Sequence, residues 1–213
     1  KTVRNRSETM NSLKDHLIKV YSTLAEGILF TVFGACFPGV PWIFSVVLGV
    51  LFMLNAMGNN CILSFFVFSF CQGLIVADLC REISWEVQFI TFVITMSIFL
   101  IFTATSFLTN KVHEFMLASL VGNMLTGLVL VSFFNWWYQS VLLVIGDVII
   151  GILVFSMYLL VDTAKIVYEH EEGCNDHILH AVQVYVDLLN IWIRLLILVD
   201  SLKKDKKKIK NKK

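Results

Sequence analysis

The stretch that decides the fold is residues 141–200, which read VLLVIGDVIIGILVFSMYLLVDTAKIVYEHEEGCNDHILHAVQVYVDLLNIWIRLLILVD. Two long apolar runs are separated by an acidic, histidine-bearing loop. Each run carries an aspartate near the loop, Asp162 in the first and Asp187 in the second. Because a bare charge is costly inside a membrane, an ionisable residue in such a run is a candidate functional residue.

The two aspartates are placed symmetrically about the loop. Asp162 and Asp187 are 25 residues apart, and their midpoint falls at Cys174. If the chain turns back at residues 171–176, each acid lies ~15 Å from the turn along its helix, which is close to mid-bilayer depth. The spacing therefore predicts a helical hairpin that brings two carboxyl groups to the same height.

The composition of the whole chain is that of a membrane protein. The 213 residues are 57% hydrophobic and only 15% charged, with a mean hydropathy of +0.78, which lies far from the norm of soluble domains. The apolar runs lie at residues 20–37, 42–57, 61–79, 85–108, 115–134, 141–162 and 178–200. We predict an all-α polytopic membrane bundle of seven hydrophobic helices, with six spans and a C-terminal seventh that is re-entrant or central.

The basic residues gather at the two ends of the chain. Eight of the 17 lie in the final eleven positions and five in the first 19. We expect a cytosolic polar N-terminus (1–19), a transmembrane helical domain (20–202) and a polybasic cytosolic tail (203–213), because Lys/Arg-rich ends prefer the cytoplasm. We expect the tail to be disordered and to bind anionic lipid headgroups rather than nucleic acid. Its lysines include Lys203, Lys204, Lys206, Lys207 and Lys208.

Asp162 and Asp187 together predict a proton-controlled site. Two carboxyl groups within hydrogen-bonding reach hold a proton between them, because ionising both would place like charges side by side. Losing that proton would separate the helices or admit a cation, which describes a pH-gated cation path. In the alternative reading the acids cap helix ends or are neutralised by Lys165 and Arg194, three and seven residues further along. Asp147 either lines the same cavity or is an acid at the membrane interface.

Metal and disulfide chemistry are not indicated. The loop histidines His170, His177 and His180 have metal-ligand residue types, but their spacing is not that of a known zinc site. The five cysteines are scattered and form no Cys-x-x-Cys pair. We expect neither a metal nor a cofactor, although the imidazoles could tune a local response to pH.

Several motifs resemble those of the Bax inhibitor-1 family. They are His16-Leu17, Val20-Tyr21, Val161-Asp162-Thr163, Asp176-His177, the run Tyr185–Ile191 and the lysine tail. The resemblance implies a bundle of six or seven helices in the endoplasmic reticulum membrane that leaks calcium, senses pH through an acid pair and suppresses cell death. It implies that Asp162 and Asp187 are that pair, with Asn190, Lys165, Arg194 and Asp147 as candidate modulators. It also implies Bcl family proteins and the inositol trisphosphate receptor as partners, with calcium and protons as the permeant and regulatory ions.

Two departures from the family pattern bear on the pH set-point. Ala164 and Lys165 follow Asp-Thr where the family has Gln, and Gln183 stands where a third acid is common. Two other functions remain open on the sequence. An intramembrane aspartyl protease also has one aspartate on each of two late helices, but its Tyr-Asp and Gly-x-Gly-Asp motifs do not match here, so we do not expect an enzyme. A non-conducting scaffold that binds apoptosis regulators or calcium channels would not need the acids.

Overall fold

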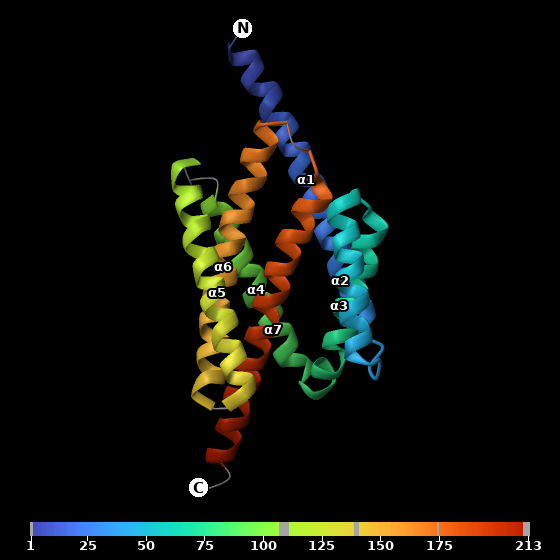
Figure 1. Cartoon of the computed structure of the whole chain (residues 1–213), viewed down its shortest axis with the longest axis vertical. Coiled ribbons are helices and arrows are strands. Elements are labelled where there is room, and N and C mark those ends of the chain that lie inside the picture. The colour runs from blue at the N-terminus through green and yellow to red at the C-terminus, as the bar shows by residue number, and fades with distance from the viewer. Residues whose placement is uncertain (1, 107–110, 139–140, 174, 211–213) are drawn as a thin grey trace. The chain divides into compact units, whose positions relative to one another are not determined.

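The structure, a computed structural model, confirms the all-α class. It describes residues 2–106, 111–138, 141–173 and 175–210, with side chains over 11–106, 118–134, 137, 144–173 and 175–204. Within these ranges the chain forms seven helices and no strand (Figure 1). They are α1 (Thr2–Ala35), α2 (Trp42–Asn59), α3 (Ile62–Glu82), α4 (Trp85–Ser106), α5 (Lys111–Tyr138), α6 (Val141–Glu171) and α7 (His177–Lys210).

Local chemistry sets the helix ends. Pro41 directly precedes α2, where a missing backbone N–H costs nothing, and Asn60 ends the helix in the left-handed conformation. The backbone carbonyl of Ser84 accepts from the N–H groups of Val87 and Gln88 at the start of α4. In the turn between α6 and α7, Gly173 has a φ of 93°. Asp176 then caps α7 by accepting from the N–H of Leu179 at 2.9 Å.

The chain divides into two compact units, and both helices of the C-terminal hairpin pass from one unit to the other. The first unit comprises Lys1–Glu82 and Lys165–Tyr185, and the second comprises Ile83–Ala164 and Val186–Lys213. The first thus holds α1, α2, α3 and the turn of the hairpin, and the second holds α4, α5 and the two hairpin arms that carry the acids.

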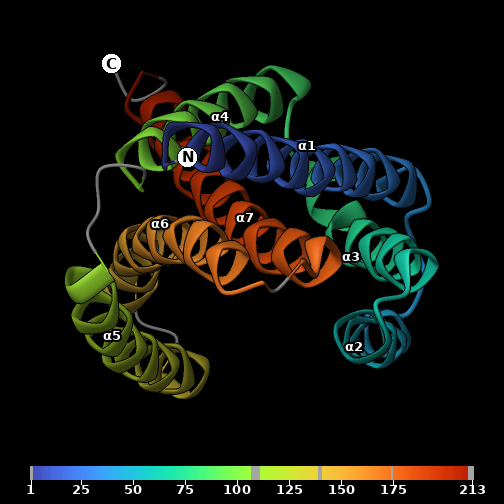
Figure 2. The same ribbon diagram turned by 90° about the horizontal axis from the view of Figure 1, so that it is seen from above.

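In the first unit α3 packs against both α1 and α2 (Figures 1 and 2). Two glycines bring α1 and α3 into backbone contact. A Cβ on Gly73 would lie 2.2 Å from the carbonyl oxygen of Thr31, and one on Gly34 would lie 2.3 Å from that of Phe70. Small residues of this kind allow membrane helices to approach closely.

Tyr185 fixes the start of α7 in the same unit. Its hydroxyl is hydrogen-bonded to Oγ1 of Thr31 at 2.5 Å, and its ring meets Phe65 and Phe68 edge-on with centroids 5.5 and 5.6 Å away. A buried tyrosine of this kind combines a large packing area with one satisfied polar group. Tyr185, which lies two positions before Asp187, is therefore anchored on α1 and α3.

In the second unit α5 and α6 run side by side (Figures 1 and 2). Their contact is a cluster of buried aliphatic residues, Val121 and Leu128 from α5 with Val154 and Val161 from α6. Val161, the last of these, directly precedes Asp162. The apolar packing of α6 on α5 thus leads directly to the acid.

Six helices of the described part are long and apolar enough to cross a membrane: α1, α2, α3, α4, α6 and α7. The apolar segment described in α5, Ala118–Phe134, is shorter. For the seventh helix we expected a re-entrant or central segment. α7 is unbroken from His177 to Lys210, whereas a re-entrant segment has to turn back within the membrane.

The polar ends differ from expectation in one respect. The tail was predicted to be disordered, but α7 remains helical to Lys210. The N-terminal polar segment is helical as well, since α1 begins at Thr2. The helices therefore continue through the predicted boundaries at residues 20 and 203, because Lys is a good helix former and a helix already fixed by packing extends at little cost.

The glycine contact between α1 and α3 gives a test of this packing. We expect Gly73→Ala to destabilise the protein by about 1–3 kcal/mol, because the methyl group meets a backbone carbonyl that cannot move aside without shifting α1. Gly122→Ala in α5 is the matched control, because a Cβ there meets no atom within 4 Å. Thermal unfolding in detergent should show a lowered midpoint for the first variant only, and equal midpoints would contradict the close contact.

Candidate functional site: the α6–α7 acid pair

The hairpin places the two aspartates at matching heights in the second unit. Asp162 lies nine residues before the end of α6 at Glu171, and Asp187 lies ten residues after the start of α7 at His177. The two carboxyl groups lie close enough to interact with each other. The structure thus brings together the two residues that the spacing singled out.

Asp187 is the more deeply buried acid, with an exposed fraction of 4%, while Asp162 is intermediate. The second oxygen of Asp187, Oδ2, is buried and has no hydrogen-bond partner in the described part of the chain. A carboxyl group that is buried without full hydrogen bonding is costly, and more so when ionised. One negative charge on two neighbouring carboxyl groups costs less than two, because like charges repel each other.

Tyr158 is a third member of this site that the sequence reasoning missed. It lies one turn before Asp162 on α6, and it interacts electrostatically with both Asp162 and Asp187. The sequence did contain an indication of this role: Tyr158 lies four residues before Asp162, and residues at i and i+4 share a helix face.

The remaining charges of this helix pair form a separate site. Arg194 of α7 donates to Asp147 of α6, with Nη1 3.0 Å from Oδ2 and 2.8 Å from the backbone oxygen. Ser132 of α5 donates from Oγ to Oδ1 of Asp147. The side chains of Arg194 and Asp147 are 16% and 17% exposed, so this is a largely buried, hydrogen-bonded ion pair.

The position of Arg194 depends on a small residue and an aromatic one. Gly151 lies one turn after Asp147, and a Cβ there would lie 2.3 Å from the guanidinium. The guanidinium carbon also lies 5.6 Å from the ring centroid of Phe155, which is within the range of a cation–π contact. These contacts direct Arg194 to Asp147, and Asp187 has no ion-pair partner among the described residues. In the alternative reading Arg194 neutralises Asp187, but the rotation of α7 turns the guanidinium toward Asp147.

Other predicted residues have partners of their own. Lys165 forms an ion pair with Glu169, one turn further along α6, at 3.5 Å. Asn190 donates to the backbone oxygen of Val186 in its own helix at 2.8 Å. Neither contact involves the acid pair, so a modulating role for these two residues stays a prediction.

The described tail lysines lie on α7. Lys203 reaches Glu86 at 3.2 Å and Ser84 at 3.1 Å, and Lys204 pairs with Asp200 at 2.6 Å. The predicted tail residues Lys206, Lys207 and Lys208 continue the helix, and their side chains lie outside the described residues.

The loop histidines lie in the first unit with one histidine from α1. His16 Nε2 lies 3.0 Å from Nδ1 of His180, and His180 Nε2 lies 2.9 Å from Oε2 of Glu169. The ring of His170 stacks on that of His16 with centroids 4.9 Å apart. Within the part of the chain whose side chains are described, no group of three or more His, Cys, Asp or Glu side chains has the arrangement of a metal site.

The ion pair between α6 and α7 can be tested by a double-mutant cycle. Arg194→Gln leaves Asp147 with one hydroxyl partner in a mostly buried place, so we expect a loss of stability of about 3 kcal/mol. Asp147→Asn alone should also destabilise the protein, because it leaves Arg194 without its counter-charge. The double variant should lose clearly less than the sum, as read from thermal unfolding midpoints. Additive losses would show that the two side chains do not interact.

Comparison with known proteins extends the match of motifs to nearly the whole chain. A family model described as "Inhibitor of apoptosis-promoting Bax1" matches residues 13–204. Probable Bax inhibitor 1 of Paralichthys olivaceus is 28% identical, with 96% of this chain and 93% of the relative covered. Bax inhibitor 1 of Bos taurus is 26% identical (93% and 91% covered), and that of Arabidopsis thaliana is 23% identical (93% and 85% covered). The chain therefore belongs to the Bax inhibitor-1 family of multi-pass membrane proteins.

Proposed function

We propose that this protein is a pH-sensitive cation leak channel, or a regulator of such a leak, with Asp162 and Asp187 as its gate. The observation that carries the proposal is the interaction between two carboxyl groups that lie at matching heights on α6 and α7. The ion that fits is calcium, because carboxylate oxygens are its preferred ligands. The proposed role is not enzymatic, and the ion is cargo rather than a cofactor.

The gating argument follows from the number of protons on the pair. With one proton shared, the two carboxyl groups attract each other and hold α6 against α7. When that proton leaves, two negative charges face each other in a medium of low dielectric constant, where repulsion is strong. Either the helices separate or a cation enters between the carboxylates, and both outcomes open a route for cations. Leak should therefore rise with pH through the titration of the pair.

The neighbouring charges support this assignment. A cationic side chain beside the pair would cancel its charge and remove the need for a shared proton. The nearest basic residues in the sequence, Lys165 and Arg194, are paired with Glu169 and Asp147. The unpartnered Oδ2 of Asp187 is a free ligand atom for a cation in the open state.

The setting we propose is the membrane of the endoplasmic reticulum, with both termini cytosolic. The basic residues at the two ends favour that orientation, and the helical lysine tail would lie against anionic lipid headgroups. By family resemblance the leak serves to suppress cell death, a role in keeping with the name Bax inhibitor 1 of the relatives. Bcl family proteins and the inositol trisphosphate receptor are the partners to test first.

Calcium efflux from proteoliposomes across a pH series tests this function. We expect leak through the wild-type protein to increase as pH rises, and Asp187→Asn and Asp162→Asn to flatten that dependence, because an amide cannot release the shared proton. The matched control is Asp200→Asn, the same chemical change on the same helix at an acid that pairs with Lys204. It should keep the wild-type profile.

Two outcomes would contradict the proposal. Identical pH profiles in the wild-type protein and both pair variants would show that the acids do not gate the leak. No leak at any pH, together with retained suppression of cell death by the double Asn variant, would favour the non-conducting scaffold.

A further inference from the structure

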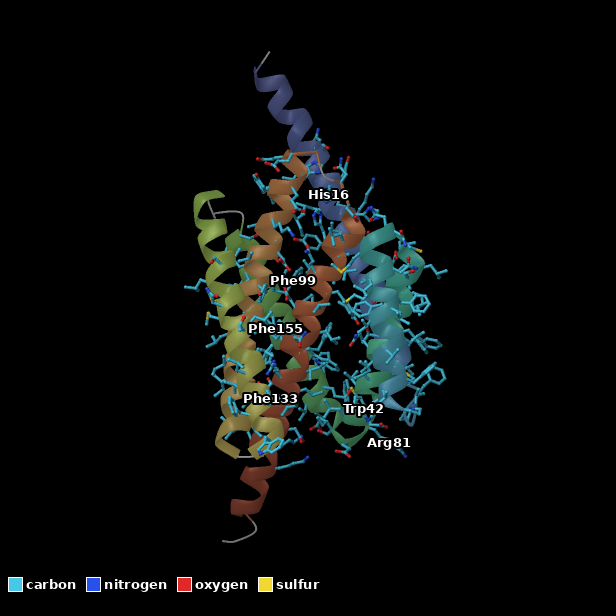
Figure 3. The ribbon with its side chains drawn as sticks, viewed as in Figure 1. His16, Trp42, Arg81, Phe99, Phe133 and Phe155 are labelled. Atoms are coloured by element: carbon cyan, nitrogen blue, oxygen red, sulfur yellow. The ribbon has the colours of Figure 1, made fainter. Side chains whose placement is uncertain are left out.

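The cluster of imidazoles in the first unit is not used by the acid-pair mechanism. It joins α1 to the turn between α6 and α7, at the height where Figure 3 labels His16. His180 is fully buried and His16 is 5% exposed. Glu169, at the outer end of the chain of hydrogen bonds, is 25% exposed, so protons from water can reach the cluster.

The hydrogen bonds determine which nitrogens carry protons. An ionised carboxylate only accepts, so Nε2–H of His180 donates to Glu169. In a neutral imidazole the other nitrogen is then an acceptor, so Nε2–H of His16 donates to Nδ1 of His180. When both rings are uncharged, the contact between α1 and α7 is thus one directed hydrogen bond.

A first added proton leaves this bond intact. It goes to Nδ1 of His180, which then donates to Nε2 of His16 after His16 has moved its own proton to Nδ1. The positive charge on His180 is balanced by Glu169 at 2.9 Å. A second proton makes both rings cationic. Two imidazolium rings have only donors, so they cannot hydrogen-bond each other.

We propose that His16 and His180 form a two-proton switch that holds α1 to the α6–α7 turn and releases it in acid. Release follows from the second proton, which replaces an attractive hydrogen bond with repulsion between two buried cations 3.0 Å apart.

The other charges around His16 set the direction of the effect. From α1 Lys19, and from the hairpin His170 and His177, act on His16 electrostatically. A positive charge on any of them repels one on His16, so they favour release. Glu169 opposes it, although its charge is partly offset by Lys165 at 3.5 Å. His170 is additionally held by Ser12, whose Oγ lies 3.2 Å from its Nε2.

The switch can be read as a distance within the first unit. Spin labels at Lys14 of α1 and Asn175 of the turn, both exposed, would be introduced into full-length protein in lipid nanodiscs after replacement of the five native cysteines. We expect a single short distance at about pH 8 and a longer, broader distribution at about pH 5, the range in which histidines titrate. An unchanged distribution over that range would overturn the proposal.

Three variants separate the switch from a purely structural contact. His16→Gln can still donate to His180 but cannot take up a proton, so the short distance should persist in acid. Glu169→Gln keeps the hydrogen bond from His180 but loses the counter-charge, so release should shift upward by about one pH unit. His113→Gln, which changes the one histidine in the second unit, should leave the profile unchanged. Acid release in His16→Gln like that of the wild type, or a downward shift in Glu169→Gln, would contradict the mechanism.

The wild-type series and Glu169→Gln remain decisive if His16→Gln does not fold. The label distance is measured without an ion gradient, so its outcome is independent of the calcium flux through the acid pair.

Discussion

The free-energy cost of burying charge governs the design of this chain. Polar groups along α6 and α7 have few ways to be stable in a low-dielectric bundle: they share a proton, form an ion pair or bond to backbone. Asp147 and Arg194 form an ion pair, and Asn190 bonds to the backbone of its own helix. For Asp162 and Asp187 the proposed arrangement is a shared proton. In the proposed function the acid pair is the one of these arrangements that depends on a proton that can leave.

The ion pair and the acid pair depend on each other through the rotation of α7. Asp187 and Arg194 are seven residues apart on one helix, so the rotation that faces Asp187 to Asp162 also carries Arg194 toward α6. Gly151 leaves room for the guanidinium there, and Asp147 and Phe155 receive it. The guanidinium is thereby directed to Asp147 rather than to the acid pair.

The first unit fixes the turn of the same hairpin by different means. Tyr185 bonds to Thr31 and packs on Phe65 and Phe68, while the backbones of α1 and α3 touch at Gly34 and Gly73. The hydrogen bond between the imidazoles of His16 and His180 also joins α1 to the first turn of α7. The turn of the hairpin is thus held to α1 by both apolar and polar contacts.

The sequence by itself determined the helical class, the hairpin and the equal depth of its two aspartates. A helix has a fixed rise per residue, so counting residues from a turn gives height without knowledge of packing. Tertiary structure decided which side chains meet across helices. Arg194 reaches Asp147, 47 residues away, and His16 reaches His180, 164 residues away, through helix rotations that no local pattern encodes. Rotation is set by the summed packing of glycines, aromatics and aliphatic residues on several helices at once, and a residue count contains none of that information.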